Sequence, residues 1–362
     1  MSTISSPAHT AHYYTAQEHF AQRFAEVGRQ SACTATSPEA YAAWKAPLRA
    51  RLSELIGLPT MQRCDGAAQV VEHTPMDGYR REKVLLQTEP GVWMPLYVLL
   101  PGDLAPGEQR PAIIAPHGHA SCGKYAVAGR TDIAEIAENI ATYNYDYGVQ
   151  MVRMGFVVFC PDARGFGERR ENNCQGDTAA QMLNTSCFSL NHMALPLGQT
   201  VTGMWTWDLM RLVDYVPQRP ECRPGPLGCA GLSGGGLQAL WLAALDDRIT
   251  AAVISGYFYG YLESLLLQHM NCSCNYVPHL WEHVDMGDIA ALIAPRPLFI
   301  ETGDVDPLNG ASGVENVCAQ VAITRRAYAL FDAADQVTHH VFPGPHRWCG
   351  EQALPWLKRQ LM

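Results

Sequence analysis

A short run in the middle of the chain has the residue types and spacing of a serine nucleophile. It reads Gly231-Leu232-Ser233-Gly234-Gly235, with an apolar strand-like run before it and a helical run after it. A serine on so sharp a turn needs small residues two positions before and two positions after it, because larger side chains would collide with the strained backbone. Ser233 is therefore the candidate nucleophile for attack on an acyl carbon through an acyl-enzyme.

The chain downstream of Ser233 offers a base and an acid, which a weakly nucleophilic hydroxyl needs. Where a serine occupies a strand-to-helix turn of this kind, the chain order is nucleophile, acid, base. His346 follows the last strand-like run and is the candidate base. Asp306 follows the strand-like run 298–301 and is the candidate acid, with Asp304 as the alternative.

Two backbone N–H groups must also stabilise the negative oxygen of a tetrahedral intermediate. The residue after the nucleophile, Gly234, supplies one of them. The loop after the apolar run 112–115 supplies the other, and Gly118 gives that loop the freedom to turn. The sequence indicates His119 or Ala120 as this donor without separating the two.

The cysteines and histidines predict neither a metal nor a cofactor. Most of the 12 cysteines lie in apolar runs, which is typical of small buried side chains in a reducing compartment. Cys272 and Cys274 form a C-x-C pair, but no second pair follows at zinc spacing. His117 and His119 likewise have no partner cluster along the sequence.

The elements around these residues predict an α/β fold with a mostly parallel central sheet flanked by helices. Apolar runs without alternation are separated by helical stretches, which is typical of strands covered on both faces. These runs lie at 112–115, 156–160, 227–230, 251–254 and 298–301.

The pattern divides the chain into two parts. Residues 1–78 are expected to form a helical N-terminal extension packed on the main domain, and 79–362 the catalytic domain. Two stretches, 168–199 and 257–293, are too long for simple connections. Because such insertions rise over the carboxyl edge of a doubly wound sheet, they are candidates for a cap.

Five further side chains are candidates for support of the substrate or of the loops. Arg164 has the fork geometry to hold the nucleophile loop through backbone carbonyls, or alternatively to bind a substrate carboxylate. The other four are aromatic: Tyr257, Tyr259, Trp281 and Trp348. Each is a candidate for stacking on a sugar, for lining an acyl pocket or for packing in the core.

These motifs together resemble the α/β-hydrolases, and among them the acetyl xylan esterase and dienelactone hydrolase branch. The resemblance covers about 80–362 and rests on the His-Gly-His loop, Ala163-Arg164-Gly165-Phe166-Gly167, the serine turn, Gly303-x-x-Asp306 and Pro345-His346. The chain departs from acetyl xylan esterases at Gly234, where they have Gln, and at Arg347, where they have Glu. Dienelactone hydrolases have Cys in place of Ser233.

The resemblance implies a serine carboxyl-ester hydrolase that acts on short acyl groups, acetyl first, including esters of carbohydrates. A peptidase or a carbon–carbon bond hydrolase on the same fold is the alternative, and a non-catalytic scaffold is a third hypothesis. The expected partner is a small-molecule ester.

Composition excludes several other partners. The formal net charge is −9 and no block of basic residues is present, so we expect no nucleic-acid binding. No apolar run approaches the roughly 20 residues that a membrane span needs, so we expect no membrane partner.

The first residues lack the pattern of a secretory signal, and we therefore expect a cytoplasmic protein. Assembly into a homo-oligomer stays an open alternative, because no sequence pattern indicates the oligomeric state.

Overall fold

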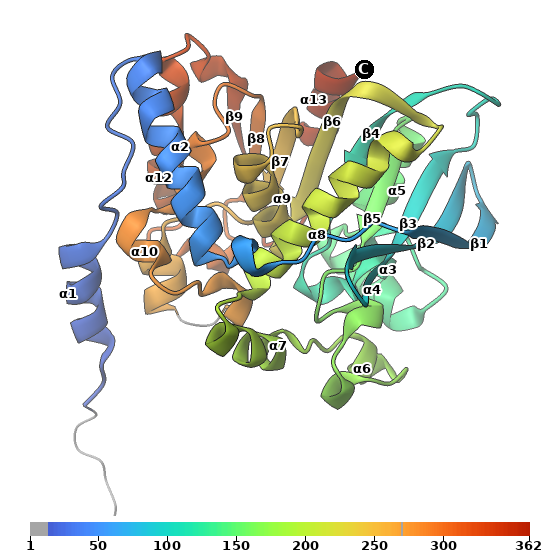
Figure 1. Ribbon diagram of the computed structural model, residues 1–362, viewed down its shortest axis with the longest axis horizontal. Helices are drawn as coiled ribbons and strands as arrows, with labels where there is room; N and C mark the ends of the chain where they lie inside the picture. The colour runs from blue at the N-terminus through green and yellow to red at the C-terminus, as the bar shows by residue number, and fades with distance from the viewer. Residues whose placement is uncertain (1–13, 269–270) are drawn as a thin grey trace, which may run out of the picture.

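A twisted sheet runs through the middle of the molecule (Figure 1). The computed structural model describes residues 14–268 and 271–362, and within them nine strands pair in the order β1-β2-β3-β5-β4-β6-β7-β8-β9. Their bounds are Ala68–Met76 (β1), Tyr79–Glu89 (β2), Val92–Pro101 (β3), Arg110–Ile114 (β4), Val157–Pro161 (β5), Cys222–Leu232 (β6), Ala251–Ser255 (β7), Leu298–Gly303 (β8) and Val337–Phe342 (β9). The pairs from β5–β4 through β8–β9 are parallel, while β1, β2 and β3 join antiparallel at one edge.

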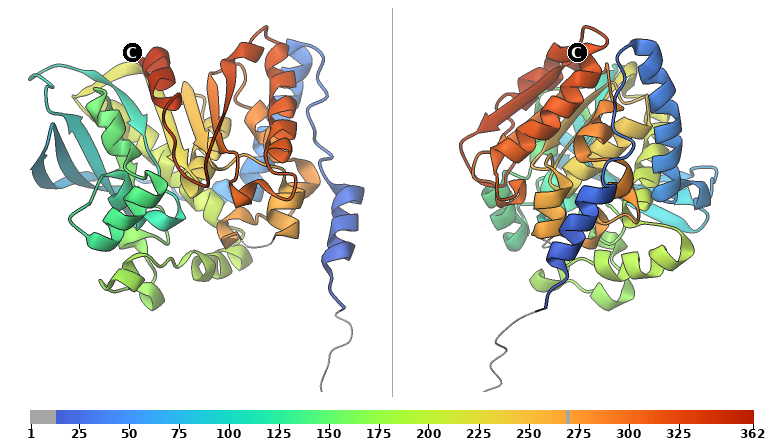
Figure 2. Two further views of the ribbon diagram at one scale, coloured as in Figure 1. Left: turned by 180° about the vertical axis from the view of Figure 1, so that it is seen from behind. Right: turned by 90° about the vertical axis from the view of Figure 1, so that its left-hand side faces the viewer.

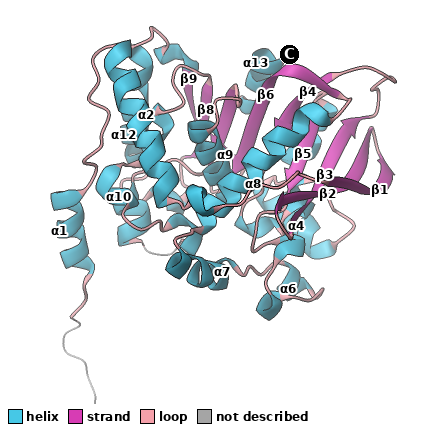
Figure 3. Ribbon diagram, in the orientation of Figure 1, coloured by secondary structure: helices cyan, strands magenta, loops and turns pink. Residues whose placement is uncertain are grey.

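Helices cover both faces of this sheet (Figure 3). Figure 1 shows α2 and α8 in front of the strands, and the view from behind in Figure 2 shows α5 and α13 in front of them. The helices are Gln17–Val27 (α1), Pro38–Leu55 (α2), Lys124–Val127 (α3), Ala134–Tyr143 (α4), Tyr147–Arg153 (α5), Ala179–Met182 (α6), Cys187–Ala194 (α7), Val201–Tyr215 (α8), Gly234–Leu245 (α9), Leu280–His283 (α10), Met286–Ala291 (α11), Val314–Ala329 (α12) and Ala353–Leu361 (α13).

The two faces of the sheet bury separate hydrophobic cores. In β4, Ala112 and Ile114 pack into the core beneath α2, α8 and α9, while Ile113 and Ala115, which directly follows β4, pack into the core beneath α5 and α13. Because side chains alternate between faces and both faces are covered, the strand is apolar throughout. This double coverage explains the unbroken apolar runs, and the predicted α/β fold is confirmed.

The N-terminal segment differs in part from the prediction. Residues 17–27 and 38–55 are helical as expected, but 68–76 form β1, an edge strand of the main sheet. The prediction of a helical extension over 1–78 is wrong for this strand. Val70 and Val71 are exposed, and β1 buries neither face, so its sequence lacks the alternation that reveals a half-buried strand.

Both long insertions follow parallel strands and therefore leave the carboxyl edge of the sheet. The first contains α6 and α7, and the second contains α10 and α11 (Figure 1). Their role as a cap stays a prediction. No helix within the described residues is long and apolar enough to span a membrane.

Candidate active site

Ser233 lies at the sharp turn between β6 and α9. Its φ of 59° and ψ of −121° form a conformation that non-glycine residues adopt rarely, mostly at functional sites. A Cβ on Gly231 would lie 2.5 Å from the carbonyl carbon and oxygen of Gly235, so only glycine fits two residues before the serine. The Ser233 N–H donates to the Ser255 carbonyl at 2.8 Å, which fixes the turn against the end of β7.

His346 and Asp306 are hydrogen-bonded to each other. Nδ1 of His346 donates to Oδ2 of Asp306 at 2.6 Å, and the Asp306 side chain is 1% exposed. The other carboxylate oxygen accepts the Leu308 N–H at 2.9 Å, so both ends of this carboxylate are fixed. Asp304 is exposed and instead accepts the Gly344 N–H at 2.8 Å, which ties down the turn before His346.

The ring of His346 lies beside the residues that hold Ser233. A Cβ on Gly256 would be 2.9 Å from Cε1 and 3.1 Å from Nδ1 of the ring. Gly256 directly follows Ser255, whose carbonyl accepts the Ser233 N–H. The fold therefore brings Ser233, Asp306 and His346 to one edge of the sheet from three separate loops.

The loop after β4 packs directly against the serine. A Cβ on Gly118 would lie 3.0 Å from the Cβ of Ser233 and would overlap the hydroxyl oxygen of Tyr145, so glycine is required for this close approach. Burial raises the pKa of Tyr145, while the backbone groups of Gly118 and Ala120 act in the opposite direction. The neutral Tyr145 hydroxyl thus lies beside the backbone of this loop.

The side chain of His119 extends over the start of α9. A Cβ on Gly234 would be 2.8 Å from Nδ1 of His119, so the ring occupies the space that a side chain at 234 would need. The opposite nitrogen, Nε2, lies 3.3 Å from Sγ of Cys274. The fold thus joins the two motifs, His-Gly-His and C-x-C, that the sequence treats separately.

His117 connects this loop to the segment after β5. Its Nε2 accepts the Ala163 N–H at 3.0 Å, and its Nδ1 donates to the Gly118 carbonyl at 2.8 Å. Burial lowers the pKa of His117 to about 4, so the ring is neutral near pH 7. Both ring nitrogens are engaged, which makes His117 a structural link.

Arg164 is held by carboxylates rather than by the expected backbone carbonyls. Its guanidinium donates to both oxygens of Asp208 at 2.8 and 3.0 Å and to Glu89 at 2.6 Å. Arg169 also contacts Asp208, at 2.7 Å. Although burial favours protonation of Asp208, the guanidinium groups of Arg164 and Arg169 hold the pKa of that carboxyl below its usual range. Arg164 is therefore structural, and its expected partners were wrong.

The four aromatic candidates divide between the core and a groove. Tyr257 and Tyr259 are buried, and the Tyr257 hydroxyl donates to Asn275 at 2.8 Å. Trp348 is fully buried and donates to Gln150 at 3.2 Å, so it belongs to the core beneath α5 and α13.

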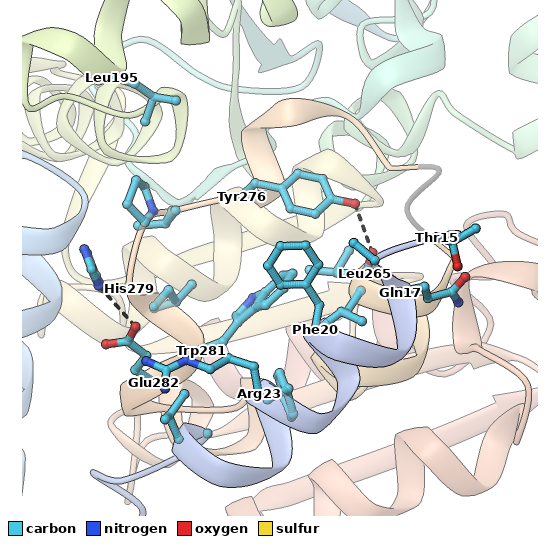
Figure 4. Close-up of a pocket in the computed structure, with 18 residues that line it drawn as sticks. Thr15, Gln17, Phe20, Arg23, Leu195, Leu265, Tyr276, His279, Trp281 and Glu282 are labelled. Carbon is cyan, nitrogen blue, oxygen red and sulfur yellow. Dashed lines mark hydrogen bonds and ion pairs between the residues drawn. The ribbon is translucent and has the colours of Figure 1, made fainter. Parts of the chain in front are cut away.

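Trp281 lines an apolar groove of about 900 Å³ between α1 and 276–282 (Figure 4). Phe20 of α1 and Leu265 share this groove, and Tyr276 closes one wall by donating from its hydroxyl to the Leu265 carbonyl at 3.1 Å. Ser233, Asp306 and His346 are not among the residues that line it.

One supporting residue that the sequence analysis missed is Glu301. Its buried carboxylate accepts the Ser255 hydroxyl at 2.8 Å and the N–H groups of Cys349 and Gly350 at 2.8 and 2.9 Å. Burial raises the pKa of Glu301. The carboxylate ties the loop after His346 to the end of β7, and an acidic residue inside an apolar strand was the signal available in the sequence.

The fold and the site together define an α/β-hydrolase, and the chain is an enzyme of that class. A mostly parallel sheet carries a strained serine between β6 and α9, and loops after later strands carry Asp306 and His346, which are hydrogen-bonded to each other. The model of the Abhydrolase family matches residues 30–355, and the chain belongs to this family.

Individual relatives agree with this assignment. A Bacillus subtilis (strain 168) protein named "Putative hydrolase YtaP" is 31% identical over 229 residues, which are 62% of this chain and 69% of that protein. A solved structure described as a putative acetyl xylan esterase from Bacteroides fragilis NCTC 9343 has a TM-score of 0.75 at 18% identity and covers 98% of this chain and 97% of its own. A glucuronoyl esterase from Solibacter usitatus has a TM-score of 0.67 at 16% identity, with 92% and 96% covered. At these identities the two structures show the fold.

Proposed function

We propose that this chain is a serine carboxyl-ester hydrolase in which Ser233, His346 and Asp306 form a catalytic triad. The observation that carries the proposal is the 2.6 Å hydrogen bond from His346 to Asp306, made by a ring that packs beside the strained turn of Ser233. Nδ1 carries the proton in that bond, so Nε2 has the lone pair of a general base.

The expected reaction has two halves. The Ser233 hydroxyl attacks the ester carbonyl carbon while Nε2 of His346 takes its proton, and the tetrahedral intermediate expels the alcohol, which leaves with that proton. Water then attacks the acyl-enzyme with the same histidine as base, and the acid is released. Asp306 keeps the ring in the productive tautomer and stabilises the imidazolium.

The backbone N–H groups of Gly234 and His119 are the proposed oxyanion donors. The sequence left His119 and Ala120 as alternatives for the second donor. His119 directly follows Gly118, and its ring lies over Gly234, which favours its N–H as the second donor. The close packing of Gly118 on Ser233 supports a donor from this loop.

A short, uncharged acyl group fits the surroundings of the serine best. Gly118 packs closely on Ser233, and the ring of His119 lies over Gly234 beside it, so we expect short acyl chains to be accepted better than long ones. Arg164, the cation that the sequence offered for a substrate carboxylate, is neutralised by Asp208 and Glu89. The names of the structural neighbours, acetyl xylan esterase and glucuronoyl esterase, support a carbohydrate ester, so we propose acetyl esters of carbohydrates.

A panel of esters and amides tests this proposal. We expect wild-type enzyme to hydrolyse p-nitrophenyl acetate faster than the butyrate and octanoate, and to release acetate from acetylated xylo-oligosaccharides. Ser233→Ala is the matched control and should reduce these rates to background. Turnover of aminoacyl p-nitroanilides without any ester hydrolysis would instead establish the peptidase alternative.

A further inference from the structure

A cluster of sulfur and nitrogen atoms lies directly beside the proposed oxyanion loop. Nε2 or Nδ1 of His119 and the Sγ atoms of Cys272 and Cys274 all lie within 4.8 Å of one another. Nε2 of His119 lies 3.3 Å from Sγ of Cys274. These three residues come from two loops that are distant in the sequence.

Cys187 adds a third sulfur to this cluster. It is buried at the start of α7, and its Sγ accepts the hydroxyl of Ser273, the residue between Cys272 and Cys274, at 3.9 Å. Cys187 therefore lies against the turn that carries the other two thiols.

The neighbouring side chains hold the cluster in place. The Asn275 side-chain amide donates to Sγ of Cys274 at 3.6 Å and to the Cys272 carbonyl at 2.9 Å. The Thr202 hydroxyl donates to the Cys274 carbonyl at 2.5 Å. Hydrogen bonds that orient ligands in this way are typical of built metal sites.

We propose that His119, Cys187, Cys272 and Cys274 form a tetrahedral site for a zinc ion. Bonds of about 2.3 Å to sulfur and about 2.1 Å to nitrogen place sulfurs about 3.8 Å apart and sulfur and nitrogen about 3.6 Å apart in such a site. The ligand atoms of His119, Cys272 and Cys274 lie within 4.8 Å of one another, so a bound ion would draw them closer together and bring in Sγ of Cys187 as the fourth ligand. Three thiolates and one imidazole form a soft ligand set that selects zinc over magnesium or calcium.

This ion has four protein ligands and is therefore structural rather than catalytic. It joins the loop after β4 to both insertions, through Cys187 of 168–199 and Cys272 and Cys274 of 257–293. On its other side the ring of His119 packs over Gly234. The zinc thereby positions the loop that supplies the proposed oxyanion donor, although its binding does not depend on the chemistry of Ser233.

Metal analysis of the purified full-length chain tests the proposal. After dialysis against metal-free buffer containing a phosphine reductant, we expect inductively coupled plasma mass spectrometry to find one zinc per chain. Replacement by Co²⁺ should give the sulfur-to-cobalt charge-transfer absorption and the visible bands of a tetrahedral thiolate site. Wild-type protein that binds neither zinc nor cobalt, or whose cluster cysteines form a disulfide under these conditions, would contradict the proposal.

Two variants separate this site from other thiols. Cys274→Ser should lose the bound zinc and the charge-transfer absorption, whereas Cys222→Ser, which alters a buried thiol at the far end of β6, should keep both. Full metal content in Cys274→Ser would overturn the assignment. The cobalt spectrum of the wild-type protein reports the ligands directly. It therefore tests the proposal even if Cys274→Ser does not fold.

Discussion

Nδ1 of His346 lies 2.6 Å from Oδ2 of Asp306, and the second oxygen of that carboxylate is held by the N–H of Leu308. This pair fixes both the tautomer and the direction of the imidazole. We therefore expect Asp306→Asn to reduce kcat for p-nitrophenyl acetate by about 10⁴-fold, because an amide favours the wrong tautomer. Steady-state kinetics should show the loss in kcat, with KM changed little.

Asp304 provides the matched control for that experiment. It is exposed and accepts the Gly344 N–H at 2.8 Å, but the ring of His346 is held by Asp306. Asp304→Asn should retain most of the wild-type kcat. If Asp304→Asn were the more damaging of the two substitutions, the assignment of the acid would be reversed.

The buried carboxylate of Asp208 should contribute strongly to stability. It is 2% exposed in its side chain and neutralises both Arg164 and Arg169. Asp208→Asn leaves two guanidinium groups without a full countercharge, so we expect the free energy of unfolding at pH 7 to fall by about 3–5 kcal/mol. Urea denaturation followed by circular dichroism measures this. The exposed pair of Arg51 and Glu54 is the comparison, and Glu54→Gln should change stability by less than about 1 kcal/mol.

The same carboxylate predicts a pH dependence. The pKa of Asp208 lies below its unfolded value of 3.8, since the effect of the two guanidinium groups outweighs that of burial. A depressed pKa in the folded state stabilises the fold above the unfolded pKa, and this stabilisation is lost as pH falls from there toward the folded pKa. The stability difference between wild type and Asp208→Asn should therefore shrink below about pH 4. A difference that grew on acidification would contradict the account.

The loop after β4 can be tested at Gly118. An added Cβ would overlap the Tyr145 hydroxyl and lie 3.0 Å from the Cβ of Ser233, so Gly118→Ala should push the proposed oxyanion donor away. Loss of one such donor typically costs 10²–10³-fold in kcat, and we expect a loss of about that size. Gly78→Ala, in a turn with nothing within 4 Å of the new Cβ, should leave kcat unchanged.

Gly234 and His119 form a second pair that a double-mutant cycle can examine. A Cβ at 234 would lie 2.8 Å from Nδ1 of His119, so Gly234→Ala should displace that ring and reduce kcat by about 10²-fold. His119→Ala alone removes both this contact and a proposed zinc ligand, so adding Gly234→Ala to it should cause little further loss of activity. Additive losses in the double variant would show that the ring and residue 234 act independently.

This contact also explains one departure from the acetyl xylan esterases. Those enzymes have Gln where this chain has Gly234, and here the ring of His119 fills that space. The sequence shows that the residue differs but contains no signal of what replaces its side chain. The packing of one loop on another supplies the reason.

The sequence predicted the parallel strands and the serine turn because both depend on local residue patterns. Apolar runs without alternation indicate a sheet with helices on both faces, and the glycines around Ser233 indicate a strained turn. The strand β1 escaped prediction because its side chains are almost all exposed, so no apolar face marks it. The partners of Arg164 escaped because Glu89 and Asp208 lie 75 and 44 residues away.

The cysteine cluster shows the same limit more clearly. His119 and Cys274 are 155 residues apart, and each belongs to a pair that lacks zinc spacing on its own. Spacing motifs detect ligands that one loop or hairpin supplies. Ligands that the fold gathers from the loop after β4 and from two insertions have no such signature.

Covalent labelling of the serine tests the central claim most directly. Wild-type enzyme should react with a fluorophosphonate and gain the mass of one phosphonyl group, which peptide mapping should place on Ser233. Ser233→Ala should remain unlabelled while keeping the wild-type circular dichroism spectrum, and Asp306→Asn should react far more slowly. Labelling that persists in Ser233→Ala, or wild-type protein that never reacts, would contradict the assignment of Ser233 as the nucleophile.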